Sequence, residues 1–175
     1  MAETLTTIEK RKSIRAFKPE QVPTEAIKTI LKAGSEAPIA MGAFDTIHFT
    51  VVQDAAIIKR ISEAATRGTK REGSDIFYGA PTVIIVSSAK QLAPGLEIAD
   101  AGAIVENFLL AATDIGIGSV YIFGANSVIA SDPELLQLVG IPDGFTPVSS
   151  AVLGYATEAA AALPKRKRSI SVNWV

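Results

Sequence analysis

The segment from residue 95 to residue 118 constrains the fold most, because it gives the longest helix signal in the chain. Its apolar side chains recur at helical spacing and form one wide face, made of Ile98, Ala101, Val105, Phe108, Leu109 and Ala112. A second face carries small residues, at which another backbone could approach closely: Ala99, Gly102 and Ala103. We therefore expect this segment to be the central helix of the domain.

Four further segments predict helices, and each contains residues suited to begin or end one. They cover residues 6–11, 24–34, 54–66 and 131–142. Thr6 and Glu9 have the spacing of a capping box, and Gly34 suits the end of a helix. Asp54 and Asp132 each precede an apolar periodic stretch and suit the N-cap position.

Four segments predict strands, because they are rich in β-branched residues or are continuously apolar over strand length. They cover residues 46–53, 81–88, 119–124 and 146–156. Helices and strands mix without strict alternation, which favours an α+β fold over a doubly wound parallel sheet. No repeat or linker divides the chain, so we expect one domain over residues 1–175.

Composition excludes several classes of site and partner. The chain has no cysteine and a single histidine, His48, so disulfides, thiolate nucleophiles and multi-histidine metal sites are excluded. A net charge of −1 argues against a nucleic-acid partner. The chain shows neither a signal peptide nor an apolar stretch of membrane-spanning length, which predicts a cytoplasmic protein. His48 lies in a strand-like segment, where we expect a structural role.

The stretch EKRKSIRAF at residues 9–17 concentrates positive charge around one hydroxyl group. On an extended segment, Arg11, Ser13 and Arg15 would share one face, with Ile14 and Ala16 turned towards the core. Two guanidinium groups and a hydroxyl suit a phosphate. The alternative is a solvated charged stretch with Arg15 in an ion pair. A second basic run, PKRKR at 164–168, could close the phosphate site or form a flexible basic tail.

Familiar catalytic motifs are missing from the sequence. There is no dinucleotide G-x-G-x-x-G, no phosphate-binding P-loop and no G-x-S-x-G. Asp100 and Glu106 are six residues apart on the central helix, so they do not form a close carboxylate pair. An enzyme of this composition would rely on a cofactor for its chemistry.

The last residues alternate in the manner of a strand, with Ile170, Val172 and Trp174 on one side. An apolar strand at a chain end invites pairing. A second subunit would cover it.

The sequence resembles the nitroreductase family of FMN-dependent oxidoreductases over nearly its whole length. The similarity rests on five stretches in the family's order: RKSIRAF, APIA, YGAPTVIIV, ADAGAIVENFLLAATDIGIGSVYI and PKRK. The resemblance implies a mostly antiparallel central sheet flanked by helices. It also implies a homodimer that exchanges its C-terminal strand or tail and holds FMN at the subunit interface, with NAD(P)H as transient reductant.

The resemblance also implies which residues hold the cofactor. The phosphate would be bound by the N-terminal motif, Arg11, Lys12, Ser13 and Arg15, and by the tail cations Lys165, Arg166 and Lys167. The ring would lie along Pro38, Ile39 and Ala40. Its reactive edge would face the backbone N–H groups of Ile122, Phe123 and Gly124. Arg67, Lys70 or Arg71 could supply a cation near the pyrimidine end of the ring. No side chain is expected to be catalytic, because FMN carries the chemistry.

The sequence departs from the family pattern after APIA, where Gly42 and Phe44 replace an asparagine and a glutamine. Phe123 stands where an acidic residue is common. The leading hypothesis is ping-pong hydride transfer to a planar small-molecule acceptor, such as a nitroaromatic, quinone or enone. The alternatives are a flavin- or nucleotide-binding sensor or carrier without turnover, and a dimeric protein that binds another phosphorylated ligand.

Overall fold

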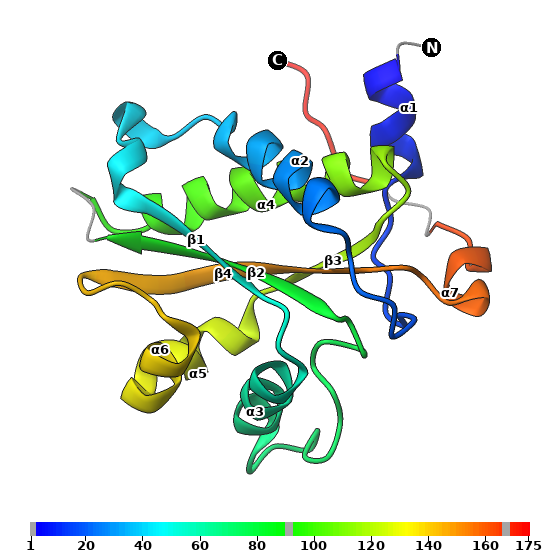
Figure 1. Ribbon diagram of the computed structural model, residues 1–175. Coiled ribbons are helices and arrows are strands. Elements are labelled where there is room, and N and C mark those ends of the chain that lie inside the picture. The colour runs from blue at the N-terminus through cyan, green and yellow to red at the C-terminus, as the bar shows by residue number, and fades with distance from the viewer. Residues whose placement is uncertain (1–2, 90–92, 166–168) are drawn as a thin grey trace.

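A computed structural model describes residues 3–89, 93–165 and 169–175 of the chain. Its centre is a four-stranded antiparallel sheet in the order β1-β2-β4-β3 (Figure 1). The strands are β1 (Ile47–Val52), β2 (Thr82–Ala89), β3 (Gly118–Ile122) and β4 (Phe145–Gly154). The α+β prediction and the predicted antiparallel sheet are confirmed. All four strands fall within or near the segments predicted for them.

Helices cover both faces of this sheet, as Figure 1 shows. One face is covered by α2 (Thr24–Ser35) and α4 (Leu96–Asp114). The other is covered by α3 (Ala55–Thr66), α5 (Gly124–Ser131) and α6 (Pro133–Val139). Two short helices lie near the chain ends, α1 (Glu3–Lys10) and α7 (Glu158–Ala162), and two 3-10 turns precede β1, η1 (Ala40–Gly42) and η2 (Phe44–Thr46).

The predicted central helix is α4, and its apolar face packs on the sheet and on α2. Most of that face is fully buried: Ala101, Ile104, Val105, Phe108, Leu109 and Ala112. Ile98 is the exception, because it lies in the first turn and is 49% exposed. The expected close approach at the small-residue face does not occur within the described residues, since a Cβ at Gly102 would meet open space.

Helix boundaries followed capping chemistry in some places and packing in others. The Asp54 carboxylate accepts hydrogen bonds from the second and third residues of α3, as predicted, and Asp132 does the same for α6. Gly34 does not end α2. It lies inside that helix, directly against the Phe108 ring, where a larger residue has no room. The capping box at Thr6 is also wrong, because α1 begins three residues earlier.

The C-terminal residues 169–175 form no strand within the described chain. Their large apolar side chains point into solvent, and Trp174 is 91% exposed. The chain ends lie on the same side of the molecule (Figure 1). Pairing of this tail with a second subunit stays a prediction.

Candidate functional site

The basic segment at residues 11–17 is extended and lies against the edge of the sheet. The backbone N–H of Ile14 donates to the Ser119 carbonyl of β3 at 2.9 Å, and Phe17 bridges to Ala156. Ile14 and Phe17 are buried, whereas Arg15 is exposed. The predicted alternation is confirmed in part: Ile14 points inward and Arg15 outward, but Ala16 is only partly buried, Phe17 is buried, and Arg11 does not share the exposure of Arg15.

Arg11 is the cation of this segment that forms an ion pair. Its Nε lies 2.8 Å from Oε1 of Glu106 on α4, and its side chain is 12% exposed against 46% for Glu106. The alternative interpretation gave the ion pair to Arg15, but among the described residues Arg15 forms none. The long side chain of Arg11 crosses to α4, while Arg15 lies four residues further along the extended segment and is exposed to solvent.

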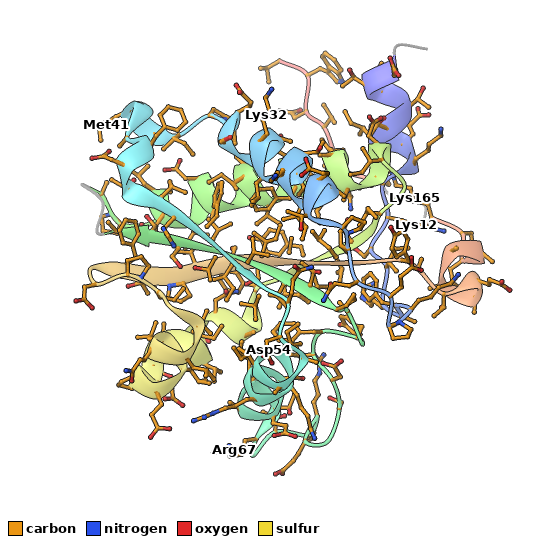
Figure 2. The ribbon with its side chains drawn as sticks, in the orientation of Figure 1. Lys12, Lys32, Met41, Asp54, Arg67 and Lys165 are labelled. Atoms are coloured by element: carbon orange, nitrogen blue, oxygen red, sulfur yellow. The ribbon has the colours of Figure 1, made fainter. Side chains whose placement is uncertain are left out.

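Two lysines join the N-terminal segment to the end of the chain. Lys12 Nζ donates to the carbonyls of Ala161 and Leu163 at the end of α7. Lys165 Nζ donates to the carbonyls of Ile8 and Glu9 at the end of α1, at 3.0 and 2.8 Å. Both cations thus meet helix C-termini, where the helix dipole favours positive charge. These bonds bring Lys165 of the tail run to the end of α1, directly before the basic segment, and Figure 2 labels Lys12 and Lys165 on the same side of the molecule. Arg166 and Lys167 lie outside the described residues.

A second set of donors lies at the other end of β3, where the strand turns into α5. Ile122 is buried, Phe123 is 56% exposed, and a Cβ added at Gly124 would meet open space. Phe123 occupies the N-cap position of α5 and offers no side-chain hydrogen bond to the first turn. The start of this helix therefore has no cap from the Phe123 side chain, and uncapped N–H groups at a helix start suit an electron-rich ligand.

The turn is held from inside by Asn126, a residue that sequence reasoning missed. Its side-chain amide donates to the carbonyls of Ile122 and Phe123 at 3.1 and 3.0 Å. Its Oδ1 accepts a hydrogen bond from the Ser150 hydroxyl of β4 at 2.6 Å. An asparagine in an otherwise small and apolar stretch, GANSVIAS, was the signal available in the sequence.

The loop after α2 carries the third group of expected residues. Pro38 is exposed, while Ile39 and Ala40 are partly buried. The backbone N–H of Ala40 donates to the buried Asp100 carboxylate of α4 at 3.0 Å, which fixes the loop to the central helix. Gly42 has φ +66°, a conformation that glycine and asparagine adopt most readily. Replacing asparagine there removes an amide group without straining the backbone.

These groups are only partly brought together within one chain. The basic segment and the Ile122–Gly124 turn lie along the same edge strand, about 13 Å apart at 3.3 Å per residue. Figure 2 places Met41, in the loop after α2, at the opposite end of the molecule from Lys12 and Lys165. Within one chain, this loop is therefore remote from the basic segment.

The segment after α3 forms a pocket of about 630 Å³ with that helix. Of the described residues expected near the cofactor, only Arg67 lines it, and Figure 2 shows Arg67 far from Lys12 and Lys165. Asp75 holds the segment in place, because its carboxylate accepts hydrogen bonds from the Ser62 hydroxyl and from two backbone N–H groups. A role for Arg67, Lys70 or Arg71 near the pyrimidine end of the ring stays a prediction.

The described residues lack two features that would indicate other kinds of site. They contain no group of three or more histidine, aspartate or glutamate side chains arranged to hold a metal ion. None of their helices combines the length and apolar character needed to cross a membrane.

The family model and the similar proteins found by comparison agree with one another. The family model described as the nitroreductase family matches residues 8–155. A protein of Archaeoglobus fulgidus whose name includes "NAD(P)H nitroreductase" is 36% identical over 158 residues, which are 89% of this chain and 86% of that protein. A Bacillus subtilis protein whose name includes "FMN reductase" and "NAD(P)H" is 26% identical. The match covers 94% of this chain and 70% of that protein. The crystal structure of a Bacteroides fragilis nitroreductase with bound FMN matches with a TM-score of 0.85 and 32% identity over 100% of both chains.

Proposed function

Because this chain belongs to the nitroreductase family, we propose that it is an FMN-dependent oxidoreductase that uses NAD(P)H as its reductant. The observation that carries the proposal is the arrangement of polar groups along the edge strand β3. A basic extended segment lies at one end of this strand, and an uncapped turn of backbone N–H groups lies at the other. FMN is likewise a phosphate joined to a flat, electron-accepting ring.

The residues at this edge fit FMN by their chemistry. Arg11 and Ser13 offer a guanidinium fork and a hydroxyl to a phosphate, with Lys12, Arg15 and Lys165 adding positive charge. Arg166 and Lys167 belong to the same tail run. At the other end, Gly124 borders open space and Phe123 is exposed, so a flat ring can approach this turn closely. Donors fixed there would stabilise negative charge on the reduced ring.

We infer that a second copy of the chain completes this site. Pro38, Ile39 and Ala40 are expected along the ring, yet their loop is remote from the basic segment of the same chain. We therefore propose a homodimer in which each subunit's loop covers the flavin of its partner. The exposed apolar tail, with Trp174 almost fully in solvent, supports the same assembly.

When bound, FMN would supply the redox chemistry, accepting a hydride from NAD(P)H and passing it to the acceptor in a ping-pong sequence. The protein's part is to bind, to orient and to exclude water. Phe123 and Phe44 are both exposed aromatic side chains, which favours planar apolar acceptors such as nitroaromatics, quinones or enones.

Anaerobic stopped-flow absorbance of the FMN-reconstituted protein tests the proposal. Mixing with NADH, and separately with NADPH, should bleach the flavin, and a quinone or nitroaromatic should restore its colour. A protein that cannot be loaded with FMN would refute the proposal. Stable FMN binding without bleaching by either nucleotide would instead support a flavin-binding sensor or carrier, which the loss of polar groups at Gly42 and Phe44 also motivates.

A further inference from the structure

Asn126 makes three side-chain hydrogen bonds in the interior of the protein and is only 1% exposed. It lies in the first turn of α5. Its partner Ser150 lies on β4, directly opposite Ile122 on the neighbouring strand. Ser150 is equally buried. The side chains around them are apolar and belong to the core below the sheet, including Ile122, Ala125 and Ile129.

Packing alone does not explain a polar pair at this place. Burying an amide and a hydroxyl in apolar surroundings is unfavourable unless their hydrogen bonds are made. Here they are made, and both Asn126 donor bonds go to carbonyls of the turn that carries the expected ring contacts. The pair therefore replaces apolar packing with hydrogen bonds that fix the backbone at Ile122 and Phe123.

The direction in which those carbonyls are held decides where the neighbouring N–H groups point. A trans peptide is planar, so its C=O and N–H point in opposite directions. The Ile122 carbonyl shares a peptide plane with the N–H of Phe123, and the Phe123 carbonyl shares one with the N–H of Gly124. Because both carbonyls point towards the buried Asn126 side chain, the N–H groups of Phe123 and Gly124 point away from it.

We propose that Asn126, oriented by Ser150, is a positioning residue that aims the Phe123 and Gly124 N–H groups at the flavin ring and so raises its reduction potential. This inference rests on the proposed function, since it needs FMN at the edge of β3. Fixed donors favour the reduced, more electron-rich ring over the oxidised one. Without the Asn126 side chain, the Ile122 carbonyl loses its bond to the amide, and the Phe123 carbonyl keeps only the bond from the backbone N–H of residue 126 at 3.2 Å. Both peptide planes are then held less firmly, and that preference weakens.

The test compares Asn126→Ala and Ser150→Ala with a matched control, Asn107→Ala. Asn107 also donates its side-chain amide to a backbone carbonyl, that of Ala33, at 2.9 Å, but it lies on α4 away from the turn. The measurements are the midpoint potential of bound FMN, the FMN dissociation constant and the thermal unfolding midpoint. Ser150→Ala is the milder change and decides the question if Asn126→Ala does not fold.

We expect Asn126→Ala to shift the equilibrium between oxidised and reduced FMN about tenfold towards oxidised, a fall of about 30 mV for a two-electron couple. Ser150→Ala should shift it less in the same direction, and Asn107→Ala should leave it unchanged. FMN affinity should stay close to wild type, because the phosphate contacts are remote. Folded, FMN-loaded variants with unchanged potential would overturn the inference alone. A wild-type protein that binds no FMN would overturn the proposed function as well.

Discussion

Replacing Arg11 with alanine separates a phosphate-binding role from a merely structural one. In the structure its guanidinium is paired with Glu106 through Nε, so part of the fork remains available to a ligand. If Arg11 binds the FMN phosphate, the variant should bind FMN more weakly but riboflavin, which lacks the phosphate, with unchanged affinity. The side chain's structural contribution should be lost at the same time.

Two energies decide whether Arg11→Ala weakens FMN binding more than it destabilises the fold. The partner Glu106 is nearly half exposed, and an ion pair in such a position contributes only about 0.2–1 kcal/mol to folding. A charge-assisted hydrogen bond to a phosphate contributes about 1.5–3 kcal/mol to binding. The FMN dissociation constant should therefore rise roughly 10- to 150-fold. The unpaired Glu106 carboxylate would then repel the phosphate, which acts in the same direction.

The assay is calorimetric titration of the apoprotein with FMN and with riboflavin, together with urea unfolding. Arg60→Ala is the matched control, because it breaks the Arg60–Glu134 pair of 2.7 Å between α3 and α6, away from the candidate site. It should leave both ligand affinities unchanged. Equal weakening of FMN and riboflavin by Arg11→Ala, or no weakening of either, would refute the phosphate-binding role.

Three other outcomes are expected. Gly34→Ala should lower the free energy of unfolding in urea by about 1–3 kcal/mol, because its Cβ would overlap the Phe108 ring. The control Gly102→Ala, whose Cβ meets open space, should instead raise it by up to about 1 kcal/mol. Asp54→Ala removes both capping bonds of α3 and should lower it by about 1 kcal/mol. Deleting residues 169–175 should give a monomer by light scattering; an unchanged dimer mass would count against the tail exchange.

The features that sequence reasoning predicted correctly depend on neighbouring residues. The strands followed from continuous apolar runs, and Asp54 and Asp132 were recognised because a cap acts on the next two or three residues. The inward direction of Ile14 followed from simple alternation along an extended segment. Each of these is decided within a few residues of chain, so the sequence alone contains the cause.

The features that it missed depend on residues far apart in the chain. Gly34 was expected to end its helix, yet α2 extends to Ser35, and the glycine instead leaves room for the Phe108 ring of another helix. The same holds for the hydrogen bonds of Lys165 with the end of α1 and of Asn126 with Ser150. No local pattern encodes such pairings, because they arise only once the elements have packed.

The two acidic residues of α4, Asp100 and Glu106, show how such long-range contacts change the interpretation of the candidate site. Their spacing excluded a carboxylate pair for acid–base chemistry, and six residues correspond to about 9 Å along a helix. The structure gives each a separate partner: Asp100 holds the N–H of Ala40, and Glu106 holds Arg11. The central helix thus fixes both the loop proposed for the partner's flavin and the segment proposed for this chain's own. In a dimer, α4 would connect the two flavin sites mechanically, and its acids would serve to position them while the cofactor supplies the redox chemistry.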